Sequence, residues 1–194
     1  MIRLEKVRTG QGIKHKLMLT MAPLVVGARA PDLMYILFYR PDFFGLPVGV
    51  LSNSIMRKAS EWSVGERELF AAFISRKNEC RFCETAHTAV AARALGKDVV
   101  DAALRGEPGT VSSKTLCMLP FLEKLTLTPD ALEPSDLVPL RDAGISDDAI
   151  ADAIHVCFLF SAFNRLVVAL GCEIMDAKQL DKVSKMLLQK GYDL

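Results

Sequence analysis

The stretch NECRFCETAH, residues 78–87, gathers Cys80, Cys83 and His87 within eight positions of a chain that has five cysteines and three histidines. On an α-helix each residue turns by about 100°, so the three side chains would share a face about 60° wide. Cys83 and His87, four apart, would be neighbours one turn from each other. A histidine so placed can take the thiol proton or stabilise the thiolate, which is the useful nucleophile. A second cysteine three positions away can then close a disulfide before over-oxidation.

A carboxylate lies twelve residues before the first of these cysteines. Glu68 extends the pattern to E-x11-C-x2-C-x3-H. If the helices on either side of residue 79 form a hairpin, Glu68 folds back towards the face that carries Cys83 and His87. Burial among the apolar residues at 69, 70, 73 and 74 would raise its pKa towards the range useful for relaying a proton. The alternative is a surface glutamate in the charged run GERE, and the spacing does not choose between the two.

Two other interpretations of the cysteine pair are open at this point. Three soft ligands on one face could bind zinc, with Glu68 as a fourth ligand. Structural zinc sites usually draw ligands from two separated knuckles, and the sequence has no second one, so we expect redox chemistry and no metal. The pair could also be simple core packing, as we expect for Cys117, Cys157 and Cys172, which lie in apolar helices.

The elements that must position these residues are all helices. No segment alternates with period two for long, and no Asn-Gly or Asp-Gly hairpin turn occurs. Ser63 and Glu66 form a capping box before the hairpin, and Gly96 is a plausible C-cap after it. We therefore predict a single all-α domain over residues 1–194, with residues 1–16 as a basic, solvated N-terminal arm. Helices are expected over about 17–39 (broken by Pro23 and Pro31), 47–60, 65–78, 81–95, 98–106, 112–128, 134–144, 147–170 and 176–190.

Composition narrows the possible partners. The net charge is +1 and the pI is near 7.6, so no strong field would attract nucleic acid. Hydrophobic residues make up 51% and the mean hydropathy is +0.23, which is apolar for a soluble protein. We expect such a chain to cover part of its surface with copies of itself, as a homo-oligomer.

Two apolar stretches resemble membrane or targeting signals. Residues 17–30 follow a basic segment and end in Ala-x-Ala, but Pro31 would sit just after the cleavage point, so secretion is not expected. Residues 153–170 are long enough to span a bilayer, but His155, Asn164 and Arg165 would be costly in hydrocarbon. We expect a buried core helix in which His155 is hydrogen-bonded. The predicted location is cytoplasmic, where a close cysteine pair is catalytic or metal-binding rather than structural.

Glu68, Cys80, Cys83 and His87 reproduce the signature of the carboxymuconolactone decarboxylase / alkylhydroperoxidase (AhpD-like) superfamily. The stretch 66–91 resembles that family's core helical hairpin, and 140–171 resembles the downstream region of its peroxidase-related members. This resemblance implies an AhpD-like helical bundle that assembles as trimers or hexamers. One departure is Phe82, which stands where the best-known peroxidase members have a histidine before the second cysteine.

The resemblance further implies reduction of a hydroperoxide substrate without a cofactor. Cys83 is then the peroxidatic cysteine, Cys80 resolves it to a disulfide, and Glu68 and His87 relay the proton. A dithiol reductant of the lipoyl type restores the reduced state. Two alternatives stay open. One is a cofactor-free decarboxylase or isomerase that uses Glu68 and His87 for acid–base work, and the other is a redox-sensing or scaffold protein without efficient turnover.

Overall fold

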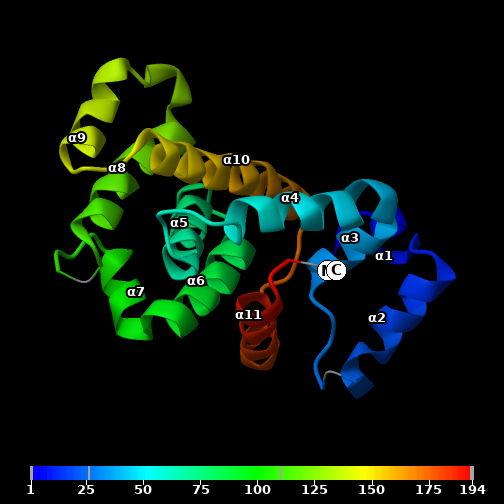
Figure 1. The fold of residues 1–194 in the computed structure, drawn as a ribbon. Coiled ribbons are helices and arrows are strands. Elements are labelled where there is room, and N and C mark those ends of the chain that lie inside the picture. Colours follow the sequence, from blue (N-terminus) through cyan, green and yellow to red (C-terminus); the bar gives the residue numbers. More distant parts are fainter. Residues whose placement is uncertain (1, 26, 110, 193–194) are drawn as a thin grey trace.

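The computed structural model describes residues 2–25, 27–109 and 111–192, and the described part contains helices and turns but no strand (Figure 1). The all-α prediction is confirmed. The α-helices are Glu5–Thr9 (α1), Ile13–Val25 (α2), Asp32–Tyr39 (α3), Leu46–Met56 (α4), Val64–Lys77 (α5), Arg81–Leu95 (α6), Lys97–Ala103 (α7), Ser113–Leu127 (α8), Val138–Asp142 (α9), Asp147–Leu170 (α10) and Ala177–Lys190 (α11). A π-helical turn over Pro41–Gly45 and two 3-10 turns over Pro129–Ala131 and Pro134–Leu137 complete them.

Helices α5 and α6 form the central hairpin, and their ends lie where the sequence predicted them. The capping box is present, because the Ser63 hydroxyl accepts from the Glu66 N–H and the Glu66 carboxylate accepts from the Ser63 N–H. Helix α6 ends at Gly96, which has φ 99°. The turn between the helices passes through Glu79 at φ 57°, a left-handed conformation that is costly for a residue with a side chain. Cys80 directly follows this strained turn.

The two helices of the hairpin approach closely at Gly65. A Cβ atom there would lie 2.7 Å from Cγ and Cδ2 of Leu95 and 3.0 Å from Cβ of Ala94. We expect Gly65→Ala to lower the free energy of unfolding by about 1 kcal/mol, because the overpacking outweighs alanine's better helix propensity. Urea denaturation measures this, with Gly12→Ala as the control because nothing lies within 4 Å of that position. Equal stability of Gly65→Ala and the wild type would contradict the close packing.

The long helix α10 packs against the hairpin and against α8 (Figure 1). Val156 and Leu159 of α10 join the main core, in which the Trp62 ring meets Phe70 edge-on at 5.1 Å. Helix α10 is the one described helix that is long and apolar enough to cross a membrane. Its buried face here is part of the core, as expected, but the prediction for His155 was wrong. That side chain is exposed, because it lies on the outer face of α10 with Phe158, which is 60% exposed.

The N-terminal segment is only partly solvated. Its lysine and arginine side chains are exposed, as expected of an arm, but Ile2 and Val7 are buried in a cluster with Ile36 of α3 and Leu170 of α10. The guanidinium of Arg3 donates to the carbonyls of residues 168 and 169. The first residues therefore cover the C-terminal end of α10. Helix α11 covers α6 on another side of the hairpin (Figure 1).

Candidate active site

The hairpin brings Glu68 and His87 into direct contact. Glu68 Oε2 lies 2.6 Å from His87 Nδ1, and the Glu68 side chain is completely buried. The His87 ring is nearly buried and meets the Phe160 ring edge-on at 4.4 Å between centroids. Of the two interpretations of Glu68, the surface one is thereby excluded. The fold places this carboxylate against the histidine of the sequence motif.

The sequence argument gave the wrong direction for the pKa of Glu68. Burial by itself would raise it, but the charges of His87 and Arg57 and their hydrogen bonds outweigh burial and lower the pKa below its ordinary value. The guanidinium of Arg57 donates to Glu68 Oε1 at 2.7 Å, and the Tyr192 hydroxyl donates to the same oxygen at 3.0 Å. Glu68 is therefore a carboxylate with three donors.

The two motif cysteines lie together in a separate apolar cluster. Cys80, Phe82 and Cys83 are buried there with Val167 of α10 and Met175 of the segment before α11. Cys83 is one turn before His87 on α6, as predicted. Cys80, however, is the N-cap residue of α6, with ψ 85°, so it is not part of the helix. The helical projection that placed it on a common face does not apply to Cys80, although the two cysteines still meet.

The contact between the two thiols shifts their pKa values in opposite directions. Hydrogen bonding with Cys83 lowers the pKa of Cys80, helped by the amide groups of Cys83 and Phe82 at the start of the helix. The same contact with Cys80, together with burial, raises the pKa of Cys83. Cys80 is therefore the more acidic thiol of the pair, which is opposite to the roles that the family resemblance implies.

The acid–base pair and the thiol pair are adjacent but not hydrogen-bonded to each other. Among the described residues, no hydrogen bond joins the His87 ring to either thiol, and Nε2 is the ring nitrogen not used by Glu68. Phe82, the departure from the best-known peroxidases, is buried beside the cysteines and adds no titratable group. Within the described part of the chain, Cys83 and His87 are therefore related by their spacing of one turn along α6 and by no hydrogen bond.

Ser75, near the end of α5, connects the cysteine turn to α10. Its carbonyl accepts from the Cys80 N–H at 2.9 Å, and its hydroxyl donates to Asn164 Oδ1 at 3.1 Å. Both side chains are buried, and Asn164 Nδ2 has no hydrogen-bond partner among the described residues. Asn164 therefore lies in the interior, on the buried face of α10. Asn164 fixes α10 against the turn that carries Cys80.

The remaining cysteines divide between core and periphery. Cys157 is buried in the main core, whereas Cys117 and Cys172 are half-buried. Cys172 packs beside the thiol cluster, where burial and the nearby Asp32 charge raise its pKa to about 12. A thiol with this pKa is a poor nucleophile at neutral pH, so Cys172 remains a packing residue. Within the described ranges, no group of three or more His, Cys, Asp or Glu residues could hold a metal ion.

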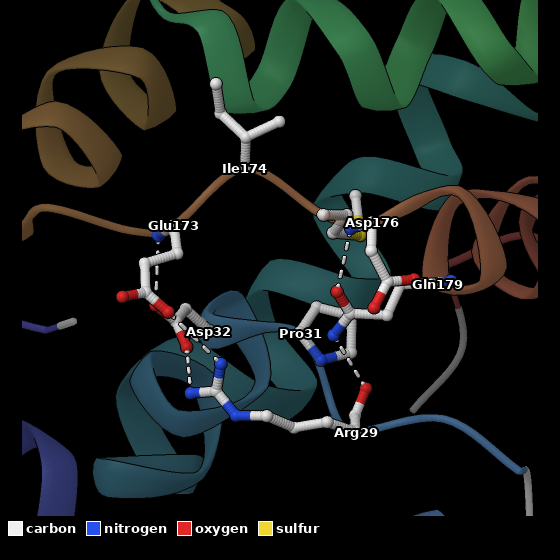
Figure 2. Close-up of a pocket in the computed structure, with 8 residues that line it drawn as sticks. Arg29, Pro31, Asp32, Glu173, Ile174, Asp176 and Gln179 are labelled. Carbon is white, nitrogen blue, oxygen red and sulfur yellow. Dashed lines mark hydrogen bonds and ion pairs between the residues drawn. The ribbon is translucent and has the colours of Figure 1, made fainter.

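A cavity of about 230 Å³ lies on the other side of Met175, between the start of α3 and the start of α11. Arg29 bridges to Asp32 at 2.6 Å along its edge, and the Gln179 side-chain amide donates to the Arg29 carbonyl at 2.9 Å. Figure 2 shows these side chains holding the segment that includes Glu173. Met175 lines this cavity and also packs in the thiol cluster.

Known proteins resemble this chain in fold, whereas searches with its sequence found no match. No protein-family model matches the sequence, and no curated protein matches it. A peroxidase-related protein of uncharacterised function from Silicibacter sp. TM1040 superposes with a TM-score of 0.74, at 21% identity over 92% of this chain and 94% of that one. An uncharacterised peroxidase-related protein from Ralstonia eutropha JMP134, described as an alkylhydroperoxidase AhpD core, gives 0.69 at 22% identity over 88% and 90%. The fold is AhpD-like.

A third solved structure with a similar fold is described as a debrominase. The debrominase Bmp8, in its apo form, superposes with a TM-score of 0.69 at 17% identity, over 88% of this chain and 92% of that one. At these identities the likeness concerns the fold alone. The fold explains the contact between Glu68 and His87, because the AhpD-like hairpin turns Glu68 back onto α6. It does not account for Arg57 and Tyr192, which sequence reasoning missed because neither belongs to a recognisable motif.

Proposed function

We propose that this protein is a thiol-dependent peroxidase that reduces hydroperoxides through a dithiol–disulfide cycle of Cys83 and Cys80. The observation that carries the proposal is the 2.6 Å contact between the buried Glu68 carboxylate and His87, one turn from Cys83. This contact orients a base beside a cysteine that has a second cysteine as its direct neighbour. The AhpD-like fold of two peroxidase-related proteins supports the same chemistry.

The cycle balances with two protons and two electrons. His87 Nε2 takes the Cys83 proton, and the thiolate attacks one oxygen of the hydroperoxide, which breaks the O–O bond and leaves a sulfenic acid. The departing alkoxide takes the proton back from His87 and leaves as an alcohol. Cys80 then attacks the Cys83 sulfur, forming the disulfide and releasing water. A dithiol reductant of the lipoyl type returns both cysteines to thiols by exchange.

Cys83 is our choice of nucleophile although Cys80 is the more acidic thiol. Its side chain is 5% exposed, whereas Cys80 is fully enclosed, and it is the cysteine one turn from His87. The lowered pKa of Cys80 suits the second step, because a resolving cysteine also attacks as a thiolate. The same lowered pKa supports the reverse assignment, and the cysteine variants in the Discussion separate the two.

The proposal is tested by stopped-flow oxidation of the reduced protein with cumene hydroperoxide, followed by steady-state consumption of dihydrolipoamide. We expect wild-type oxidation at least about 100-fold faster than that of a free thiol at the same pH, with a disulfide between Cys80 and Cys83 as the product. Dihydrolipoamide consumption should require peroxide. Oxidation no faster than that of the free thiol would overturn the proposal.

One observation favours a second candidate. His87 is hydrogen-bonded to Glu68 but to neither thiol, which is the arrangement of an acid–base pair acting on its own. A cofactor-free decarboxylase or isomerase of the carboxymuconolactone decarboxylase type would use it without the cysteines. Such an enzyme would keep its activity in a double Cys80→Ser, Cys83→Ser variant, whereas the peroxidase would lose it. The stopped-flow assay also includes an organic bromide, because of the fold shared with the debrominase.

We further propose that the protein works in the cytoplasm as a homo-oligomer, a trimer or hexamer. The support is a set of large apolar side chains left on the surface of this chain. Phe158 of α10 is 60% exposed, Leu46 of α4 is 68% exposed, and Leu17 of α2 is 59% exposed. Large apolar side chains left on the surface are typical of a chain that buries them against further copies of itself.

A further inference from the structure

Asn164 of α10 carries a buried hydrogen-bond donor that has no partner. Its side chain is 1% exposed, and among the described residues its Nδ2 donates to no acceptor. The other atom of the amide is used, because Oδ1 accepts from the Ser75 hydroxyl at 3.1 Å. A donor that is buried without an acceptor costs free energy, so native structures hold few of them. Such a group is accounted for where a ligand supplies the missing acceptor.

The other buried side-chain atoms without a partner in the described ranges differ from this one. They are Nε of Arg57 and Arg67, Nδ2 of Asn78 and Oγ1 of Thr88. Both guanidinium groups donate through their other nitrogens, so each of these side chains is still anchored. Asn78 and Thr88 are half-buried residues. Asn164 combines an enclosed side chain with a nitrogen that makes no hydrogen bond.

The position of Asn164 along α10 places it opposite the reacting groups. It follows Phe160 by four residues and precedes Val167 by three, so the three side chains share one face of the helix. The Phe160 ring meets the His87 ring, and Val167 packs in the apolar cluster that holds both cysteines. Asn164 therefore lies between the residue that contacts the histidine and the residue that packs with the thiols.

A second connection, through Ser75, holds Asn164 close to the turn that carries Cys80. Ser75 accepts the Cys80 N–H at its carbonyl and donates its hydroxyl to Asn164 Oδ1. Because Oδ1 is bound to the end of α5 in this way, the amide group is fixed in rotation and Nδ2 is directed away from Ser75. Helix α10 lies across the hairpin and contacts α6 as well as α5 (Figure 1).

We infer that Nδ2 of Asn164 is a catalytic donor, which hydrogen-bonds the oxygen that departs when the peroxide O–O bond breaks. The inference rests on the proposed function. There the Cys83 sulfur forms a bond to one peroxide oxygen, the O–O bond breaks, and its electron pair stays on the other oxygen. Asn164 donates a hydrogen bond to that oxygen, and the proton that makes it an alcohol comes from Cys83 through His87. A fixed, buried donor at the place where negative charge develops lowers the barrier.

This role predicts a dependence on the leaving group of the oxidant. An alkyl hydroperoxide releases a strongly basic alkoxide, which gains most from a hydrogen-bond donor in the transition state. A peroxy acid releases a weakly basic carboxylate, which gains far less. Loss of the Asn164 donor should therefore slow the first oxidant much more than the second. A role in structure alone would affect both oxidants alike, since both need the same attacking thiolate in the same place.

The test is rapid-quench oxidation of the reduced protein by cumene hydroperoxide and by peracetic acid, with the Cys80–Cys83 disulfide measured by mass spectrometry. We expect Asn164→Leu, an apolar replacement of similar size, to react about 100-fold more slowly with cumene hydroperoxide and less than about threefold more slowly with peracetic acid. Asn164→Ala, which needs no extra space, should show the same difference between the oxidants.

Ser75→Ala is the matched control, because it removes the contact to Oδ1 and leaves Nδ2 in place. We expect it to change the rates with both oxidants by one common factor. Alkylation of Cys83 by iodoacetamide, which needs no donor for an alkoxide, should proceed in Asn164→Leu and Asn164→Ala at the wild-type rate.

The outcomes separate this inference from the proposed function. If the Asn164 variants react with both oxidants at wild-type rates, or are slowed by the same factor with both, the inference is overturned and the peroxidase stands. If the wild type reacts with both oxidants no faster than a free thiol does, the proposed function is overturned, and the inference with it. A large loss confined to cumene hydroperoxide supports both.

Discussion

We expect Cys83→Ser to abolish peroxide-dependent consumption of a dithiol, with a loss of at least about 1,000-fold relative to the wild type. The serine hydroxyl is not ionised at neutral pH and cannot attack the O–O bond. In Cys80→Ser the first step survives, and oxidation stops at a sulfenic acid on Cys83, which a dimedone adduct located by mass spectrometry would show. Cys117→Ser, in a half-buried thiol away from the pair, is the control and should keep full activity.

The opposite result would reassign the roles within the pair. If Cys80→Ser is inert while Cys83→Ser accumulates a sulfenic acid on Cys80, the peroxidatic cysteine is Cys80. That outcome would agree with the lowered pKa of Cys80, which results from its hydrogen bond with Cys83. Activity in both single variants would show that neither thiol is the nucleophile, and would remove the dithiol cycle.

The second large effect concerns Glu68, whose replacement by glutamine should lower both activity and stability. Loss of the carboxylate leaves the Arg57 guanidinium, which is 15% exposed, without its counter-charge. We expect a loss of about 3 kcal/mol in the free energy of unfolding at pH 7, measured by urea denaturation. Peroxide turnover should fall by about 100-fold or more, because the His87 tautomer is no longer fixed. Glu123→Gln, in an exposed ion pair with Lys77, is the control and should change stability by less than about 1 kcal/mol.

The free energy of unfolding at acid pH should also depend on the ionisation of Glu68. The pKa of Glu68 is lower in the folded protein than its ordinary value of 4.5. Its contribution to stability is therefore complete above about pH 4.5 and is lost as the pH falls through the lower folded value. Glu68→Gln should remove that part of the pH dependence, so its unfolding free energy should fall less steeply than the wild type's below pH 4.5. Parallel profiles for the two proteins would contradict the lowered pKa.

The ends of the two hairpin helices could be predicted because residues close by in the sequence determine them. Ser63 and Glu66 cap α5 through side chains three positions apart, and Gly96 ends α6 as a single residue. The four-residue motif was recognisable for the same reason, since Cys83 and His87 are one turn apart on one helix. Fold and motif therefore follow from short-range patterns, and the AhpD-like comparisons confirm the fold.

The electrostatics of the site could not be predicted in that way. The pKa of Glu68 has the opposite direction to the one that burial suggested, because the charges and hydrogen bonds of His87 and then of Arg57, the residue after α4, outweigh burial. Tyr192 is separated from Glu68 by 124 residues, and no pattern joins the two. Cys80 was treated as helical, but the left-handed turn at Glu79 leaves it at the N-cap, where it becomes the more acidic thiol. The pKa values of the site residues therefore depend on long-range contacts and backbone turns, which the spacing of residues along the sequence does not reveal.

The separation of Tyr192 from the hairpin also sets an order of assembly during synthesis. Glu68 and His87 are 19 residues apart and can meet as soon as the hairpin leaves the ribosome, whereas Tyr192 follows Glu68 by 124 residues. Contacts of high sequence separation form late, since the loop between them must close first. A nascent chain therefore carries Cys80 and Cys83 before α11 covers α6 and before the Glu68 carboxylate has its third donor. The length of this interval is set by the time needed to translate the residues between His87 and Tyr192.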